Sequence, residues 1–360
     1  MAPQHGSTFY SIQYLRFVAA FMVVLVHASH SLVTYLGSDR IPVLWAGGNG
    51  VDIFFVISGF IMVMIGRTTR RSGWEFFWLR FTRIAPPYWI VTTVMVATIF
   101  AVPQLLQASA ADPAHIIASY LFIPWHHPAA EIQPVLHVGW TLNLEFIFYS
   151  IFAALLWVGT RWRGPAIVGV LAALTALGYV FEPSAALPAD WNASVMMEFA
   201  FGVMVGYAYF AGLRMPAWAG LALLVGGFAM ILQQDLMSGV YDRQRWIQSG
   251  IPATAIVLGA LMLERAGRVG QNQFWRFMGD ISFSLYLCHY FAIGFLRAVW
   301  PDALMGNLAM DILFLTVTAI VSIAGSAAFY VILERPLVRI AQNRVKAYFR
   351  RDRASALPAE

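Results

Sequence analysis

The sequence is poor in charge. Only 11% of its 360 residues are Asp, Glu, Lys or Arg, whereas 60% are hydrophobic and the mean hydropathy is +0.68. Soluble domains carry roughly 25% charged residues, so the composition excludes a soluble globule, and the same hydrophobicity excludes a disordered chain. Cysteine is nearly absent too: Cys288 is the only one, which excludes a disulfide-stapled secreted scaffold. The composition therefore indicates a polytopic membrane protein.

Lysine is also rare in the sequence. Lys346 is the only lysine, so Arg supplies the other 22 of the 23 cations behind the net charge of +5. These arginines lie mostly between hydrophobic runs, where topology signals are found. The basic balance therefore indicates membrane topology, and no nucleic-acid partner is expected.

The fold class predicted is all-α, a polytopic membrane helix bundle of about ten transmembrane helices. Runs of about 17–25 apolar residues are long enough to cross a bilayer as helices. The ten runs are Leu15–Tyr35, Val51–Gly66, Ile84–Val102, Gly139–Val158, Pro165–Phe181, Ala193–Ala211, Ala217–Leu232, Ile247–Leu263, Ile281–Val299 and Asn307–Leu333. We read the first run as a retained helix rather than a cleaved signal peptide, because nine further runs follow it.

The arginines between these runs predict the orientation. With the N-terminus in the cytoplasm, 19 cations fall on the inner side and 4 on the outer side (Arg40, Arg243, Arg245 and Arg297). This split is a strong positive-inside signal, so both termini are expected in the cytoplasm. Two regions follow, a transmembrane domain over 1–338 and a basic cytoplasmic tail over 339–360, which either lies on anionic headgroups or is solvated.

Four ionisable residues stand out inside the apolar runs, where each is a functional hypothesis because its burial in lipid is costly. They are His27, Asp52, Glu145 and His289. Arg16 precedes His27 by eleven residues, close to three helical turns, so the two share a face about 16 Å apart along the axis. This layout suits a long anionic ligand that enters from the cytosol with its reactive end near a general base. The alternative is a topogenic arginine and a purely structural histidine.

Counted from opposite ends of their runs, His27 and Glu145 lie at similar depth, and Asp52 begins the second run on the same side. A histidine with a carboxylate neighbour is a plausible acid–base pair, because the carboxylate fixes the tautomer and stabilises the imidazolium. The alternative is a buried ion pair that only holds helices together.

Two arginines three residues apart, Arg80 and Arg83, share a face if their segment is helical. Arginine binds phosphate through two parallel hydrogen bonds, so the pair is a candidate phosphate site. The longest predicted outer loop, Pro103–Val138, holds His115, His126, His127 and His137. No clear ligand spacing supports a metal site there, and no metal is expected.

Six segments in order resemble the acyltransferase-3 family of membrane O-acyltransferases, most closely those of the succinoglycan exopolysaccharide type. The similarity runs over nearly the whole chain. It rests on residues 10–16 with His27, on 50–60, on 80–84 (Arg-x-x-Arg), on 140–146, on 282–289 and on 334–336. Thr141 and Asn143 stand where the family pattern has serines, which puts any hydroxyl-dependent role there in doubt.

The resemblance implies acyl-CoA, usually acetyl-CoA, as the donor and a glycan hydroxyl, or that of a lipid-linked oligosaccharide, as the acceptor. It implies a multi-pass protein of the bacterial cytoplasmic (inner) membrane, surrounded by lipid. It leaves open whether the chain forms homo-oligomers or joins polysaccharide-assembly machinery. By the same resemblance His27 and Arg16 are essential, Arg80 and Arg83 contact the CoA phosphates, and Glu145 supports the active centre.

We therefore predict a membrane-embedded O-acyltransferase. His27 is the general base, with Glu145 or Asp52 as its carboxylate partner, and CoA binds at Arg80, Arg83 and Arg16. The predicted substrate-binding residues are Ser58, Trp140, Asn143 and His289. The alternatives are a proton-coupled transporter or flippase of lipid-linked sugars, and a scaffold of a polysaccharide machine. A covalent acyl-His27 intermediate is the main variant of direct transfer.

Overall fold

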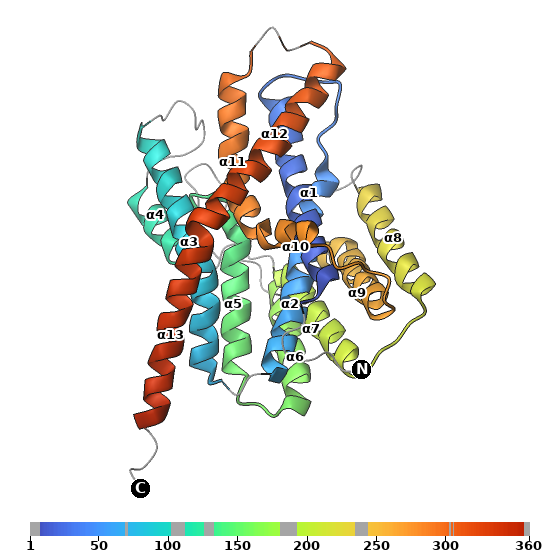
Figure 1. The fold of residues 1–360 in the computed structure, drawn as a ribbon, viewed down its shortest axis with the longest axis vertical. Helices are drawn as coiled ribbons and strands as arrows, with labels where there is room; N and C mark the ends of the chain where they lie inside the picture. The colour runs from blue at the N-terminus through green and yellow to red at the C-terminus, as the bar shows by residue number, and fades with distance from the viewer. Residues whose placement is uncertain are drawn as a thin grey trace. The chain divides into compact units, whose positions relative to one another are not determined.

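The computed structural model describes residues 8–68, 71–101, 112–125, 133–180, 193–234, 244–301, 304 and 306–355 (Figure 1). The chain divides into two compact units, each treated by itself below. Unit 1 comprises Met1–Thr68 and Gly164–Ala327, and unit 2 comprises Thr69–Arg163 and Ala328–Glu360.

Unit 1 is built from helices. They are α1 (Tyr10–Thr34), η1 (Trp45–Asn49), α2 (Gly50–Thr68), most of α6 (Thr160–Val180), η4 (Ala193–Val195), α7 (Met196–Phe210), α8 (Ala217–Gln233), η6 (Trp246–Gly250), α9 (Ile251–Arg265), α10 (Gln273–Asp280), α11 (Ser282–Val299) and α12 (Leu308–Phe329, to Ala327). In this unit α1 packs against α2, α10 and α11, and α8 packs against α9 (Figure 1). Helix α1 is thus the central element that carries Arg16 and His27.

Small residues allow α2 and α7 to approach each other closely. A Cβ atom added at Gly59 would collide with the backbone carbonyl of Phe199, and one at Gly202 would collide with that of Val56. Lipid-facing helices gain no hydrophobic driving force from pairing, so close backbone approach through glycine is a main source of their packing energy. The buried Phe60 and Tyr209 then pack edge to face beside this contact.

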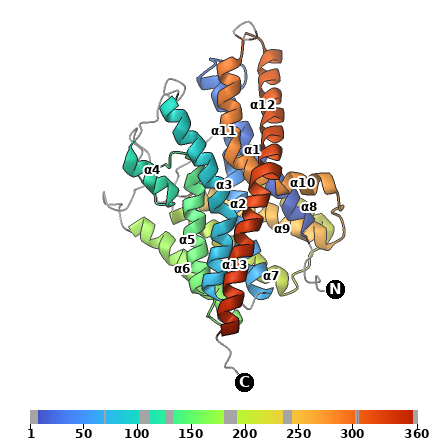
Figure 2. The same ribbon diagram turned by 60° about the vertical axis from the view of Figure 1, so that its left-hand side comes forward.

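Unit 2 holds α3 (Gly73–Ala101), α4 (Pro113–Tyr120), η3 (His137–Gly139), α5 (Trp140–Ala154), η8 (Tyr330–Glu334) and α13 (Arg335–Ser355). Helices α5 and α13 both pack against α3, and the three run together in Figure 2. Phe76 of α3 stacks on Phe152 of α5, and Phe81 lies 5.5 Å from Phe146, ring centroid to centroid. The start of α3 therefore faces the end of α5.

The all-helical membrane fold is confirmed. Every regular element among the described residues is helical, and seven of the described helices are long and apolar enough to cross a membrane. Each of the ten predicted runs coincides with a helix, but α5, α7 and α8 have only 15, 15 and 17 residues. The count of ten spans and the cytoplasmic placement of the termini stay predictions.

The third helix begins eleven residues earlier than the run Ile84–Val102 predicts. Its first turn is stabilised at Ser72, whose Oγ accepts a hydrogen bond from the amide of Glu75. Phe76, which follows, is buried against Phe152 of α5, and the segment is helical although its arginines interrupt the apolar run. Arg80 and Arg83 consequently lie about 10 and 15 Å along α3 rather than in a loop before it.

Candidate functional site

His27 lies in α1 and is half-buried. Its Nδ1 atom is 2.9 Å from Nε2 of His289 in α11, and the two imidazole planes are inclined by 26°. The ring of Tyr290 lies 4.6 Å from that of His27. The structure thus brings together two of the ionisable residues that the sequence singles out, across 262 positions of the chain.

His289 is completely buried, and its Nδ1 atom is 3.0 Å from the backbone carbonyl of Leu285, one turn earlier in α11. Both ring nitrogens of His289 therefore have hydrogen-bond partners within unit 1. His289 is a predicted substrate-binding residue, and the geometry adds a hydrogen bond to the predicted general base.

Asp52, at the start of α2, is paired with an arginine. Arg245 donates from Nε to Oδ1 at 2.8 Å and from Nη2 to Oδ2 at 2.6 Å, and both side chains are buried. This two-point geometry is the strongest form of an arginine–carboxylate bond. Glu198 of α7, fully buried, interacts electrostatically with both groups. Asp52 therefore belongs to a buried charge cluster within unit 1.

The remaining predicted residues of unit 1 are Arg16 and Ser58. Arg16 is half-buried on α1 and donates to Gln13 Oε1 at 3.2 Å. Ser58 lies in the interior of α2 and is 8% exposed. Because α1 is continuous from Tyr10 to Thr34, the axial separation of about 16 Å between Arg16 and His27 holds in the structure.

The predicted arginines of unit 2 lie among carboxylates. Arg83 forms an ion pair with Glu334 of η8, whose side chain is fully buried. Arg80 interacts electrostatically with Glu145 and Tyr149 of α5, and Tyr149 donates a hydrogen bond to Glu145. These five side chains, named here the unit 2 charge cluster, hold two guanidinium groups and two carboxylates. Its net charge is zero when all four are ionised.

Two predicted substrate-binding residues begin α5. Trp140 is its first residue and is half-buried, and Asn143 follows one turn later. Asn143 is 5% exposed, and its Oδ1 atom has no hydrogen-bond partner among the described residues. The neighbouring Thr141 instead donates to the carbonyl of Val138 at 3.0 Å. Of these positions, Asn143 thus offers a buried acceptor to a ligand.

Two of the four histidines of the predicted outer loop have structural partners. His115 Nε2 is 2.6 Å from the carbonyl of Gln133, and His137 bonds to the side chain of the same glutamine. His126 and His127 lie outside the described residues. Within the described ranges, no group of three His, Cys, Asp or Glu side chains is arranged to hold a metal ion.

Arg245, Glu334 and Tyr149 were not among the predicted site residues, although a signal for Arg245 was present. It is one of the four cations on the predicted outer side, where the positive-inside rule disfavours arginine. Two of its three companions are also engaged. Arg40 donates to Asp311 at 2.8 and 3.1 Å, and Arg297 lies 4.2 Å from the ring centre of Tyr35. The third, Arg243, lies outside the described residues.

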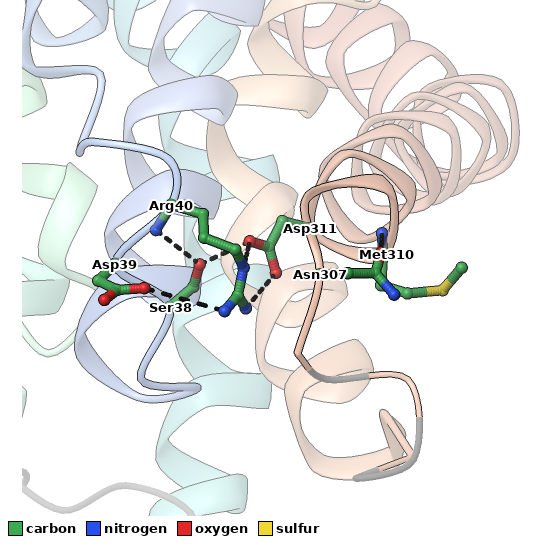
Figure 3. A network of polar contacts seen from close by, with 6 residues as sticks. All are labelled: Ser38, Asp39, Arg40, Asn307, Met310 and Asp311. Atoms are coloured by element: carbon green, nitrogen blue, oxygen red, sulfur yellow. Dashed lines mark hydrogen bonds and ion pairs between the residues drawn. The ribbon is translucent and has the colours of Figure 1, made fainter.

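The Arg40 contact joins the segment after α1 to the start of α12 (Figure 3). Ser38 also donates to Asp311, at 2.6 Å, and Asn307 caps α12 by accepting from the amide of Met310. The hydrogen bonds from Arg40 to Asp311 raise the pKa of the guanidinium above its usual value. Two of the four arginines on the predicted outer side, Arg40 and Arg245, thus pair with a carboxylate.

Comparison with known proteins adds the family. Residues 9–331 match the acyltransferase domain family. The chain is 36% identical over 302 residues to the exopolysaccharide production protein ExoZ of Rhizobium meliloti (strain 1021). The aligned region covers 83% of this chain and 92% of that protein. It is 24% identical to the acyltransferase MdmB of Streptomyces mycarofaciens, over 93% of this chain and 92% of that protein.

A more distant similarity, 29% identity, connects 42% of this chain to 25% of the peptidoglycan O-acetyltransferase OatA of Listeria monocytogenes serovar 1/2a (strain ATCC BAA-679 / EGD-e). No solved structure matches the chain. The family match spans most of the chain, as do the motifs from Arg16 to Glu334. This membrane protein therefore belongs to the acyltransferase-3 family and is an O-acyltransferase.

Proposed function

We propose that this protein transfers an acetyl group from acetyl-CoA to a hydroxyl of a cell-surface polysaccharide or of its lipid-linked precursor, with His27 as general base. The observation that carries the proposal is the His27 imidazole, set inside a membrane helix and hydrogen-bonded through Nδ1. An ionisable group in this position is costly and is therefore a functional hypothesis by default. Family membership makes that chemistry acyl transfer rather than transport or scaffolding.

In the proposed step the acceptor hydroxyl gives its proton to Nε2 of His27 as its oxygen attacks the thioester carbonyl carbon. The new carbon–oxygen bond forms, the carbon–sulfur bond breaks, and the thiolate leaves with the proton that His27 returns. A positioned base of this kind contributes roughly 10²–10⁴-fold to a rate. Ser58, Trp140 and Asn143 are proposed to bind the reacting groups. The buried Asn143 Oδ1, which has no hydrogen-bond partner among the residues that the structure describes, supports this role.

We propose the unit 2 charge cluster as the site for the CoA phosphates. Arg80 and Arg83 offer guanidinium groups on one face of α3, and an arriving phosphate would replace the carboxylates that balance them now. Arg16 of unit 1 stays a proposed CoA-binding residue. Glu145 stays a candidate support of the active centre, and Asp52 a candidate only through Arg245, its bidentate partner.

The acceptor class is inferred from the relatives. One is named for exopolysaccharide production and another for O-acetylation of peptidoglycan, so both names concern polysaccharides of the cell surface. The predicted topology would place the protein in the bacterial cytoplasmic membrane, with the donor arriving from the cytosol.

The test measures CoA release from acetyl-CoA by the purified protein in nanodiscs, with and without crude lipid-linked glycan. Wild type should release CoA faster when the glycan is present, and His27→Ala, matched for melting temperature, should lose this stimulation. Phe295→Ala is the control, because Phe295 is 62% exposed on α11. If a folded His27→Ala keeps the stimulated rate, His27 is not the base.

A second measurement separates direct transfer from an acyl-His27 intermediate. Wild type is incubated with acetyl-CoA without acceptor and analysed by intact-mass spectrometry. Direct transfer predicts no added acetyl group on the protein. A stoichiometric mass increase that disappears on addition of glycan would instead establish the covalent route.

A further inference from the structure

The hydrogen bonds of His289 define which of its nitrogens carries a proton. A backbone carbonyl can only accept, so the 3.0 Å contact with Leu285 requires a proton on Nδ1 of His289. The ring is fully buried, where a charged form would cost much solvation energy, so it is neutral and its Nε2 atom carries a lone pair.

This assignment fixes the tautomer of His27 as well. Its Nδ1 atom, 2.9 Å from the lone pair of His289 Nε2, must be the donor of that bond. A neutral imidazole carries one proton, so Nε2 of His27 is left as an acceptor. This is the state that a general base needs before it receives the hydroxyl proton.

We infer that His289 is a positioning residue that holds His27 in its reactive tautomer and orientation; this rests on the proposed role of His27. The acceptor of the His27 Nδ1 proton is thus an imidazole nitrogen of α11. His289 also cannot use either ring nitrogen to bind substrate while both hydrogen bonds are made.

A neutral partner suits this location. A carboxylate in the position of His289 would place an ion at this nitrogen in the membrane interior, where an ionised group costs several kcal/mol. His289 fixes the ring without a formal charge. When His27 accepts the hydroxyl proton, its Nδ1–H bond to His289 becomes charge-assisted and therefore stronger, which stabilises the imidazolium that forms.

Aromatic contacts hold the two rings in place. Tyr290 lies 4.6 Å from His27 and 4.9 Å from His289, centroid to centroid, and Tyr286 lies 6.3 Å from His289. Both of these side chains are titratable phenols of α11. Their position on α11 makes the same helix supply both the acceptor nitrogen and its packing.

Three variants at one position test the inference. His289→Gln places an amide oxygen where Nε2 lies and can still accept from His27. His289→Asn reaches only the position of Nδ1, and His289→Phe keeps the ring without hydrogen bonding. We expect the turnover number to fall about 10²–10³-fold in the Asn and Phe variants, with the KM for acetyl-CoA within about twofold. His289→Gln should retain activity to within about tenfold of wild type.

A double-variant cycle separates positioning from a merely structural role. In a His27→Ala background, measured with radiolabelled acetyl-CoA, His289→Asn should cause no further loss, because its partner is gone. Loss of equal size in both backgrounds, or full activity of folded His289→Phe, would overturn the inference. Phe295→Ala on the same helix is the control for nonspecific damage.

A readout without turnover distinguishes failure of this inference from failure of the proposed function. Nitrogen-15 spectra of histidine-labelled protein in nanodiscs report which ring nitrogens are protonated. We expect protonated Nδ1 and unprotonated Nε2 on both residues, with the signals assigned by His27→Ala and His289→Phe. A reversed His27 tautomer would refute the inference even in an active enzyme, whereas the expected spectrum in an inactive protein would count against the proposed reaction alone.

Discussion

The two units use their buried polar groups differently. In unit 1, His27 and His289 form an imidazole pair in which one ring fixes the other. In unit 2, the charge cluster sets two guanidinium groups against two carboxylates. An imidazole pair is suited to moving a proton, whereas a balanced ionic cluster is suited to holding a charged ligand by exchange of partners. Substitutions in unit 1 should therefore change turnover, and those in unit 2 should change KM.

The largest loss of stability is expected for substitution of Asp52. A catalytic role of Asp52 would also contradict the comparison of the two units. Asp52→Asn leaves the buried Arg245 without its charge partner, and such a loss costs about 3–5 kcal/mol of stability. Combining Asp52→Asn with Arg245→Met should restore most of the melting temperature measured in detergent. Restored folding with no acyl transfer would show that the Asp52–Arg245 pair takes part in the reaction.

The next effect sharpens the comparison in unit 2. Arg80→Gln or Arg83→Gln should raise the KM for acetyl-CoA about 10–100-fold, because each removes a charge-assisted phosphate contact worth about 1.5–3 kcal/mol. The turnover number should change little, and Glu334→Gln should lower KM by removing a competitor of the phosphate. Steady-state kinetics at low and high salt measure both quantities.

The control for this series is Arg161→Gln in the same unit, because Arg161 is exposed and its guanidinium lies over the neighbouring ring of Trp162. Its KM should equal that of wild type. A lower turnover number with unchanged KM in the Arg83 variant would move the charge cluster into the chemical step.

A smaller effect is expected where α2 meets α7, the helices that carry Asp52 and Glu198. Gly202→Ala should lower stability by about 1–3 kcal/mol, because the added methyl group overpacks against the carbonyl of Val56. Gly226→Ala on α8 is its matched control, since a Cβ atom there meets no atom of the described residues within 4 Å. Equal melting temperatures for the two variants would contradict the close backbone contact.

The smallest effect is expected at Arg40, which is partly exposed. Arg40→Gln should give the smallest fall in melting temperature of the series. A pKa raised in the folded state means that the contribution is fully present below the ordinary arginine pKa and is lost only above it. The difference from wild type should thus stay constant between about pH 6 and pH 9. A difference that vanishes within this range would assign it to another group.

The hydrophobic runs predict the helices well because each run must satisfy its backbone hydrogen bonds internally in lipid. The hydrophobic runs do not predict helical segments that polar residues interrupt. The start of α3 at Gly73 is hidden by Arg80 and Arg83, and α13 is too polar to register as a span. Both segments are helical because they pack on each other in unit 2.

The candidate residues were identifiable from the sequence, but their partners were not. His27 and His289 are 262 positions apart, and depth along separate helices favours Glu145 or Asp52 equally well. The depth of a residue in the membrane does not show how its helix is rotated about the helix axis. This rotation decides which side chains contact each other. Rotation is set by packing, such as the glycine contacts of α2 and α7.

Those glycine contacts also bear on biosynthesis. Helix α7 has 15 residues, fewer than the roughly 20 that cross a bilayer, and it carries the buried Glu198 in its first turn. Such a segment partitions weakly into lipid on its own. Helix α2 precedes α7 in the chain and is synthesised first. Gly59 therefore leaves the ribosome well before Gly202. Integration of α7 should therefore depend on α2 as a template, and a bulky residue at either glycine would cause a fault of insertion rather than of catalysis.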